Sequence, residues 1–193
     1  MSRFLIVGLG NIGAEYAKTR HNVGFMAVDM WVHQRQEAWT QDKAAYSAQF
    51  TYRGKSVVVI KPVTYMNLSG KAVQTHLTLH RIPTEQCLII ADDLALPFGS
   101  IRVRSKGSHA GHNGFRNIQE VLQTENFPRL RIGIGDSFSK GKQTDFVLGE
   151  FSNSEQSDLQ TTILPACCVA IEDFIFRGIQ ETMTRANKNL LTK

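Results

Sequence analysis

The sequence predicts one α/β domain, residues 1–193, in which a mixed β-sheet is sandwiched between α-helices. Two observations support this fold class. Short apolar runs alternate with longer amphipathic stretches, which is typical of parallel strands connected by helices. The runs at residues 46–52 and 55–61 meet at Arg53-Gly54, which indicates an antiparallel hairpin in the same sheet. The chain is also long enough to bury a core as a single domain.

The first half of the chain begins with a buried strand that ends at Gly8. Asn22 and Ser69 are residue types that cap helices, and each stands directly before a helical stretch, so we expect both to act as N-caps. Pro62 ends the second strand of the hairpin. The expected elements are strands at residues 3–8, 46–52, 55–61 and 87–91, and helices at residues 23–37 and 70–80.

The second half has a glycine-rich loop at residues 106–114 before its first helix. Pro165 is expected to kink or divide a long helix that opens at Ser154. The polar stretch at residues 136–144 contains two lysines and one glycine and is predicted to form a mobile flap. The expected elements are strands at residues 100–104 and 130–134, and helices at residues 115–123, from residue 154 onward, and at residues 179–191.

The composition is that of a globular protein, with 42% hydrophobic and 20% charged residues. No uninterrupted apolar run approaches the roughly 18 residues of a membrane span, and the N-terminus lacks the features of a signal peptide. The three cysteines are not arranged as C-x-x-C, which argues against a zinc ribbon or a redox pair. We therefore expect a cytoplasmic protein without a membrane anchor.

The net charge of +5 is concentrated in one segment, residues 102–142. This segment contains eight basic and three acidic residues, an excess that equals the net charge of the whole chain. Clustered positive charge indicates a phosphate-rich partner, most simply a nucleic acid, although a solvated basic surface explains the charge equally well. The basic residues are Arg102, Arg104, Lys106, Arg116, Arg129, Arg131, Lys140 and Lys142.

Residues 8–13, GLGNIG, satisfy the pattern G-x-G-x-x-G after a strand. In a dinucleotide-binding fold these glycines open a helix whose N-terminus meets a pyrophosphate, and an acidic residue about 20 positions later ends a second strand. Here the first helix is expected only after Asn22, and the acidic candidate Asp29 falls inside that helix. The surroundings of the pattern therefore favour another function.

Polar side chains gather after the predicted strands and in the glycine-rich loops. Because the carboxyl ends of parallel strands lie at one edge of a sheet, these side chains are expected to line one cleft. A histidine, a carboxylate and several carboxamides suit hydrolysis of an acyl bond by general-base catalysis. The candidates are Asn11, Tyr16, His21, Asn67, Asp92, Asp93, His109, His112 and Asn113.

Other chemistries find less support in the sequence. There is no G-x-S-x-G motif, and the cysteines lie in apolar or helical settings, so no covalent nucleophile is evident. His109 and His112 are close together, but on a glycine loop rather than a helix, and H-E-x-x-H does not occur, so we expect no metal. His33, His76 and His80 fall in helical segments and are expected to be hydrogen-bonded structural residues.

Six blocks of the sequence resemble bacterial peptidyl-tRNA hydrolases, in the order in which that family has them, over almost the whole chain. The resemblance implies hydrolysis of the ester between the C-terminus of a peptide and the 3′-terminal ribose of tRNA. It also implies a monomeric α/β enzyme without metal, other cofactor or obligate protein partner. The blocks are GLGNIGAEYAKTRHNVGF (8–25), KPVTYMNLSGKAV (61–73), DDLALPFGSIRVR (92–104), GSHAGHNGFRNI (107–118), RLRIGIG (129–135) and DFVLGEF (145–151).

The resemblance implies roles in catalysis for three residues. His21 would be the base that activates water, and Asp92 would support it. Asn11 would contact the peptide main chain near the ester and help to reject free aminoacyl-tRNA. The residues that would bind the peptide or the tRNA are Tyr16, Tyr65, Met66, Asn67, Asn113, Arg104 and Arg131.

The resemblance implies different roles for the substrate-binding residues. Asn67 and Asn113 would position the substrate, and Asn113 could also hold the water. Tyr16 and Tyr65 would line the site for the peptide and the terminal nucleotide, and Met66 would pack beneath the cleft and constrain His21 and its neighbours. 

Other positions match the family less closely. Arg104 and Arg131 fit, more loosely, basic positions that face the 5′-phosphate of the tRNA. Ile12 replaces the usual proline of the first loop, and Ala95 replaces the acidic residue that usually follows the leucine of the third block, but neither change removes a residue assigned to the chemistry. From the residues alone two alternatives stay open: a noncatalytic RNA-binding protein, from the basic segment, and a Rossmann-type nucleotide-binding protein, from the glycine pattern.

Overall fold

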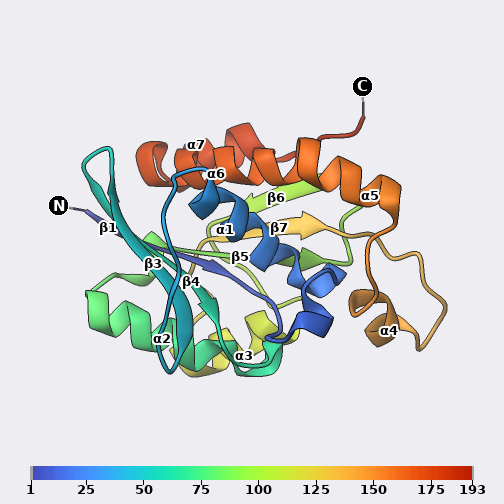
Figure 1. The fold of residues 1–193 in the computed structure, drawn as a ribbon, viewed down its shortest axis with the longest axis horizontal. Helices are drawn as coiled ribbons and strands as arrows, with labels where there is room; N and C mark the ends of the chain where they lie inside the picture. The colour runs from blue at the N-terminus through green and yellow to red at the C-terminus, as the bar shows by residue number, and fades with distance from the viewer. Residues whose placement is uncertain (1, 193) are drawn as a thin grey trace.

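The computed structural model describes residues 2–192, which form an eight-stranded mixed sheet covered by helices on both faces (Figure 1), so the predicted fold class is confirmed. The strands are β1 (Arg3–Gly8), β2 (Thr40–Gln41), β3 (Ala45–Tyr52), β4 (Lys55–Pro62), β5 (Cys87–Asp93), β6 (Ser100–Arg104), β7 (Arg129–Gly133) and β8 (Lys188–Asn189). The α-helices are α1 (Val23–His33), α2 (Ser69–His80), α3 (Asn113–Leu122), α4 (Gln143–Val147), α5 (Asn153–Asp158), α6 (Leu164–Arg177) and α7 (Ile179–Ala186).

The centre of the sheet is parallel and its flanks are antiparallel. The strand order is β2-β3-β4-β1-β5-β7-β6-β8. β4, β1, β5 and β7 run parallel, with Leu5 opposite Cys87 and Asp92 opposite Ile132, whereas β3 and β6 run antiparallel to β4 and β7. Because β4, β1 and β5 are parallel neighbours, the loops that follow them leave from the same edge of the sheet.

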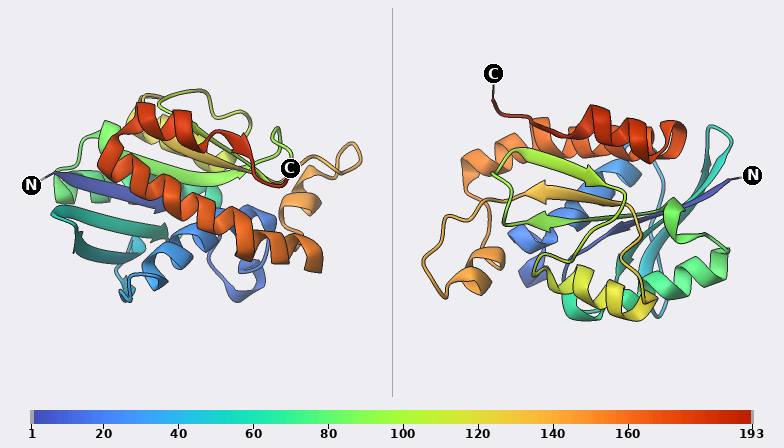
Figure 2. Two further views of the ribbon diagram at one scale, coloured as in Figure 1. Left: turned by 90° about the horizontal axis from the view of Figure 1, so that it is seen from above. Right: turned by 180° about the vertical axis from the view of Figure 1, so that it is seen from behind.

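Alternation along the central strands separates two cores. In β1, Phe4 and Ile6 belong to the core beneath α1 and α6, and Leu5 and Val7 belong to the core beneath α2 and α3. Figure 2 shows these two helical layers from two further directions. Burial of apolar surface on both faces, at about 25 cal/mol per Å², holds the sheet and fixes the edge that carries the loops.

Two predicted helices end earlier than expected. α1 ends at His33 rather than near residue 37, and Gln36 adopts a left-handed backbone conformation with φ of 55°. The last helix ends at Ala186 rather than near residue 191, because the following residues pair with β6 as β8, where Lys188 lies opposite Ile101. Pairing with a distant strand satisfies backbone groups in a way that helical periodicity does not reveal.

Asn22 and Ser69 do not cap their helices with their side chains, contrary to the prediction. The side chain of Asn22 instead accepts the backbone N–H of Asn11 at 2.8 Å and donates to the backbone carbonyl of Asn11 at 2.9 Å. The hydroxyl of Ser69 donates to the carbonyl of Met66 at 2.9 Å. Both side chains thus fix the loops at the carboxyl edge of the sheet.

The C-terminal helical stretch is interrupted next to Pro165, as predicted. Ser152 caps α5 in a capping box with Glu155. A π-helical turn, Leu159–Ile163, separates α5 from α6, and Pro165 lies in the first turn of α6. The stretch Asn153–Arg177 is long and apolar enough to cross a membrane, but 56% of its most apolar window is buried inside the protein, as in a core helix.

His76 on α2 is buried, and neither of its ring nitrogens has a hydrogen-bond partner among the described residues, which corrects the prediction for this histidine. Its Nε2 lies 3.5 Å from a carboxylate oxygen of Asp42, and its ring stacks on that of His80 with centroids 5.7 Å apart. Burial lowers the pKa of both histidines and outweighs the opposing charge of Asp42. In His80 the charge of Arg3 acts in the same direction as burial.

Replacement of His76 by leucine is expected to make the protein less sensitive to mild acid. A histidine whose pKa is lower in the folded state is protonated first in the unfolded chain, so stability is complete above pH 6.5 and is lost as the pH falls towards the folded-state pKa. A pKa difference of one corresponds to about 1.4 kcal/mol. Urea unfolding at pH 7 and pH 5 should show a smaller loss of free energy in the variant, whereas exposed His33→Ala should behave as wild type. An equal loss in His76→Leu and wild type would contradict the prediction.

Candidate active site

A cavity of about 280 Å³ lies at the edge of the sheet where β1, β4 and β5 end. The loops after these strands form its wall together with the glycine-rich loop before α3 and residues of α4. A concave site with a few convergent polar groups is the usual location of a ligand. Its lining includes Asn11, His21, Tyr65, Met66, Asn67, Asp92, His112, Asn113, Arg131 and Leu148.

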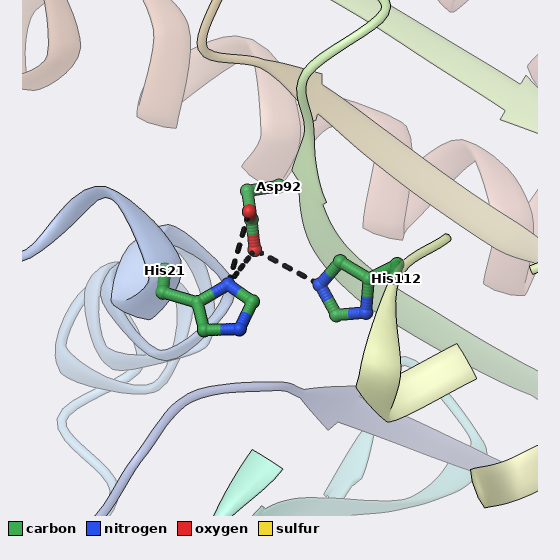
Figure 3. Close-up of side chains that lie close together, drawn as sticks. All are labelled: His21, Asp92 and His112. Carbon is green, nitrogen blue, oxygen red and sulfur yellow. Dashed lines mark hydrogen bonds and ion pairs between the residues drawn. The ribbon is translucent and has the colours of Figure 1, made fainter. Parts of the chain in front are cut away.

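His21 and Asp92 form a buried pair in this cavity (Figure 3). His21 lies in a 3₁₀ turn before α1, Asp92 lies at the end of β5, and Nδ1 of His21 is 2.9 Å and 3.0 Å from the two carboxylate oxygens. An ionised carboxylate only accepts hydrogen bonds, so Nδ1 carries the proton and Nε2 keeps its lone pair. Nε2 makes no hydrogen bond to another described residue, so it is available to a water molecule.

The electrostatics of the pair favour an ionised Asp92 and a basic His21. Burial acts to raise the pKa of Asp92, but the interactions of its carboxylate with His21 and His112 outweigh burial and hold this pKa well below its usual range. Burial acts to lower the pKa of His21, but the charge of Asp92 and its hydrogen bond outweigh burial and raise this pKa above 6.5. This geometry suits a general base with a carboxylate that orients it.

His112, one of the residues predicted to line the cleft, is a third member of this cluster, but its contact with Asp92 was not predicted. Its Nε2 lies 3.0 Å from Oδ1 of Asp92, and its ring centroid lies 5.0 Å from that of His21. Its Nδ1 caps α3 by accepting the backbone N–H groups of Gly114 and Phe115 at 3.1 and 3.3 Å. Its position directly before a helix is a sequence signal for the cap, but no local pattern reveals a partner 20 residues earlier.

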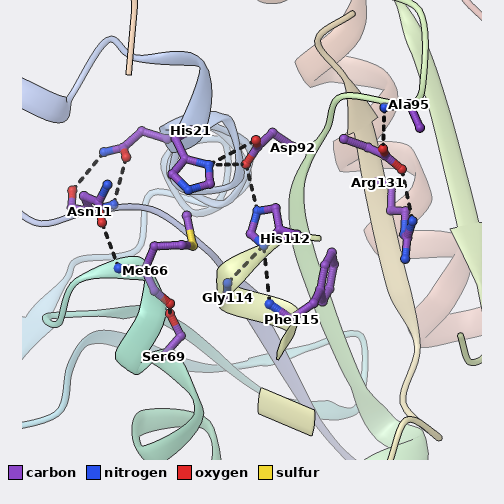
Figure 4. Close-up of polar contacts among 12 residues, drawn as sticks. Asn11, His21, Met66, Ser69, Asp92, Ala95, His112, Gly114, Phe115 and Arg131 are labelled. Atoms are coloured by element: carbon purple, nitrogen blue, oxygen red, sulfur yellow. Dashed lines mark hydrogen bonds and ion pairs between the residues drawn. The ribbon is translucent and has the colours of Figure 1, made fainter. Parts of the chain in front are cut away.

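Asn11 is held from two sides (Figure 4). The side chain of Asn22 bonds to the backbone N–H and carbonyl of Asn11. The side-chain carbonyl of Asn11 accepts the backbone N–H of Met66 at 2.8 Å. Because Oδ1 is engaged in this way, Nδ2 is the donor that remains for a ligand. Met66 is buried beside it, as the resemblance implied, whereas the contribution of Asn22 was not predicted.

The cavity brings together most of the predicted substrate-binding residues. Tyr65 and Asn67 are exposed around the 3₁₀ turn after β4, and Asn113 is exposed at the start of α3. Tyr16 does not line the cavity, contrary to the expectation from the resemblance. It ends a short 3₁₀ turn in which its backbone carbonyl accepts the hydroxyl of Thr19 at 2.8 Å, and this turn keeps it out of the cavity wall.

The basic segment, residues 102–142, contains both structural and exposed residues. Arg129 is fully buried and donates to the carbonyl of Ser108 at 3.1 Å, so it is not available to a phosphate. Arg131 donates to the same carbonyl at 2.6 Å and pairs with Asp93 at 3.2 Å. Both arginines of β7 therefore hold the glycine-rich loop. The exposed basic residues are Arg102, Arg104, Lys106, Arg116, Lys140 and Lys142.

The register of β6 and β7 places four arginines on one face of the sheet. Arg102 lies opposite Arg131, and Arg104 lies opposite Arg129, and opposed residues of an antiparallel pair share a face. Arg131 lines the cavity, whereas Arg102 and Arg104 are exposed on the neighbouring strand. Positive charge therefore continues from the cavity wall onto the surface of β6.

The ligand atoms of His21, Asp92 and His112 lie within 4.8 Å of one another, a spacing that could hold a metal ion. Their hydrogen bonds argue for a network without one. Because Nδ1 of His112 accepts two backbone N–H groups, the proton of the neutral ring is on Nε2, which faces Asp92. A protonated ring nitrogen donates a hydrogen bond and does not bind a metal.

The glycines of residues 8–13 serve close packing rather than phosphate binding. A Cβ on Gly8 would lie 2.4 Å from the carbonyl oxygen of Gly24, and a Cβ on Gly10 would lie 2.7 Å from the ring of Phe25. Only a three-residue 3₁₀ turn follows Gly13, so this loop does not lead into a helix that could receive a pyrophosphate. The structure therefore argues against the dinucleotide-binding interpretation.

An α/β sheet that holds a histidine–carboxylate pair and several carboxamides in one cavity is an arrangement that suits the class of hydrolases that activate a water molecule. Residues 5–193 match the family model described as Peptidyl-tRNA hydrolase. The chain belongs to the peptidyl-tRNA hydrolase family, hydrolases that act on the ester bond of peptidyl-tRNA. The family that the six sequence blocks indicated is thereby confirmed.

Relatives with this name match the chain over nearly its full length. A peptidyl-tRNA hydrolase of Bacteroides fragilis (strain ATCC 25285) is 45% identical over 186 residues, 96% of this chain and 99% of the relative. That of Porphyromonas gingivalis (strain W83) is 46% identical over 185 residues, 96% of this chain and 100% of the relative. The crystal structure of the Acinetobacter baumannii peptidyl-tRNA hydrolase has a TM-score of 0.91 and 35% identity, over 97% of this chain and 95% of that one.

Proposed function

We propose that this chain hydrolyses peptidyl-tRNA in the cavity at the carboxyl edge of the sheet, with His21 as the general base and Asp92 as its support. The observation that carries the proposal is the contact of 2.9 Å between Nδ1 of His21 and Asp92, which leaves Nε2 free in a cavity lined by carboxamides. The match to peptidyl-tRNA hydrolases over nearly the whole chain supplies the substrate.

In the proposed reaction, Nε2 of His21 takes a proton from water while the water oxygen attacks the carbonyl carbon of the ester. Asp92 stabilises the imidazolium that forms. The bond between this carbon and the ribose oxygen then breaks, and His21 gives the proton to that oxygen, which leaves as a ribose hydroxyl. The products are the peptide acid and free tRNA, and no covalent enzyme intermediate is needed.

Neutral amides surround the reacting ester in this scheme. Nδ2 of Asn11 would bind the peptide main chain, which free aminoacyl-tRNA lacks beyond its single residue. Asn67 and Asn113 would position the substrate, and Asn113 would also hold the attacking water. Tyr65, whose side chain is exposed, has a ring face on which the terminal base can stack.

The tRNA would be held through its phosphates by the arginines that continue from the cavity onto β6. Contacts to phosphates position a nucleic acid without reading its bases, which suits an enzyme that accepts many tRNAs. Arg131 is at the cavity and Arg104 is exposed on the same face of the sheet, so these two would meet the 5′-phosphate. Arg129 is excluded from this role by its burial.

Replacing Arg104 by glutamine is expected to raise KM for peptidyl-tRNA several-fold and to leave kcat unchanged, because the lost contact binds substrate and transition state equally. The slope of log affinity against log salt concentration should become shallower by about one. Arg53→Gln, at the exposed β3–β4 turn, is the matched control and should keep the slope of wild type. An unchanged slope in Arg104→Gln would rule out this phosphate contact.

Release of an N-acetyl-aminoacyl group from tRNA by the wild-type protein tests the proposed function. If the protein binds this tRNA and leaves its ester intact, the noncatalytic RNA-binding alternative is correct and the proposal fails. We also propose that the enzyme is a cytoplasmic monomer that needs no metal, other cofactor or protein partner, since one chain supplies every assigned side chain. Sedimentation under the assay conditions tests the oligomeric state.

A further inference from the structure

We propose that His112 is a positioning residue for this reaction: a hydrogen-bond donor, fixed by the N-terminus of α3, that orients Asp92 and reduces the negative charge that this carboxylate presents to His21. The inference rests on the proposed role of His21 as the base. Among the described residues, the hydrogen bonds of His112 go to Asp92 and to the backbone of α3, so Asp92 is the group that links it to the base.

The backbone of α3 sets the tautomer of His112. Gly114 and Phe115 both direct their N–H groups at Nδ1, at 3.1 and 3.3 Å, and two such donors require a lone pair on that nitrogen. In the neutral ring the proton is therefore on Nε2. Protonation of Nδ1 would remove both hydrogen bonds and leave two N–H groups of the helix without a partner, so these contacts favour a ring that carries its proton on Nε2.

The proton on Nε2 is directed at the oxygen of Asp92 that also contacts the base. Oδ1 of Asp92 lies 3.0 Å from Nε2 of His112 and 2.9 Å from Nδ1 of His21, and the side chain of Asp92 is only 3% exposed. The carboxylate cannot turn away from His21 without losing the bond to His112. A donor on this oxygen also takes up part of the negative charge that would otherwise act on His21, so His112 tunes both the geometry and the basicity of the base.

Replacement of His112 by asparagine separates this role from the helix cap. Asparagine is a preferred N-cap, so it can accept the N–H groups of α3, but it is too short to reach Asp92 at the same time. We expect kcat to fall about tenfold with little change in KM, because the interaction is made through the base and not with the substrate. The acid limb of the kcat/KM profile should move to higher pH, since the full charge of Asp92 then raises the pKa of His21 further. His112→Gln, which has a longer amide donor, should restore part of kcat.

A double-mutant cycle with Asp92→Asn distinguishes a His112 that positions Asp92 from a His112 that only caps α3. Without the carboxylate, His112→Asn should cause little further loss, because the group through which His112 acts is absent. Equal losses in the two backgrounds, or an unmoved acid limb in the single variant, would overturn the proposal.

Two controls keep this test separate from stability and from the proposed function. Thermal unfolding checks the fold, and His112→Ser, a second short N-cap, repeats the test if asparagine lowers stability. An inactive wild type would overturn the proposed function, whereas additive losses in an active enzyme would overturn the role of His112 alone.

Discussion

Replacement of His21 by alanine is expected to lower kcat for ester release by about a hundredfold to ten-thousandfold, the range that general-base catalysis contributes. KM should change little, because the imidazole acts on water and its contribution is made in the transition state. Single-turnover release of an N-acetyl-aminoacyl group from tRNA measures the effect. The expected loss is large because, among residues 2–192, Nε2 of His21 is the one ring nitrogen of the cluster without a hydrogen-bond partner: Nδ1 of His21 and both nitrogens of His112 are occupied.

The pH dependence gives this prediction a second readout. In the wild type, kcat/KM should decrease as the pH falls through the pKa of His21, which the charge of Asp92 raises above 6.5. The residual activity of His21→Ala should lack this decrease. His33→Ala, an exposed histidine at the end of α1, should keep the wild-type rate and profile. Equal rates of His21→Ala and wild type would show that His21 is not the base.

Features that depend on neighbouring residues were predictable from the sequence. The hairpin is an example: Arg53 and Gly54 both have positive φ, 45° and 78°, and the flanking strands begin and end within one residue of the prediction. Assembly of the cavity was also predictable, because the loops after parallel neighbouring strands must meet at one edge. This rule places Asn11 and Asp92 together, from β1 and β5.

Features that depend on a distant partner were not predictable. Asn22 is a residue type that often caps helices, yet its side chain bonds to the backbone of Asn11. This contact forms because folding brings the two segments together. A count of charges treats Arg129 as a phosphate-binding candidate, whereas the structure buries it against the glycine-rich loop. His112 has a helix to cap, but its bond to Asp92 depends on the path of that loop across β7. In each case a long-range contact decides among roles that the residue type leaves open.

Gly24→Ala is expected to be the most damaging substitution outside the cavity, although Gly24 is not part of the G-x-G-x-x-G pattern. A Cβ at this position would lie 2.3 Å from the carbonyl oxygen of Ile90 and 2.6 Å from that of Leu9. Both atoms are backbone and cannot be moved by a change of rotamer. Helix α1 would have to retreat from β5, which would strain the hydrogen bond from Phe25 to Leu9, at 3.2 Å.

The retreat of α1 should affect both stability and chemistry. We expect Gly24→Ala to lose about 3 kcal/mol of the free energy of unfolding, the upper part of the range for overpacking. His21 precedes Gly24 by three residues and Asp92 follows Ile90 by two, so the same movement separates the base from its carboxylate. A displacement of about 1 Å at a catalytic group can cost a hundredfold in rate, so the molecules that still fold should have low kcat.

Gly54→Asn is the matched control: a Cβ there meets no described atom within 4 Å, and asparagine tolerates the left-handed backbone of the turn. Urea unfolding and ester release should therefore be near wild type for Gly54→Asn and severely reduced for Gly24→Ala, and a Gly24→Ala protein with wild-type stability and rate would show that α1 does not set the position of His21.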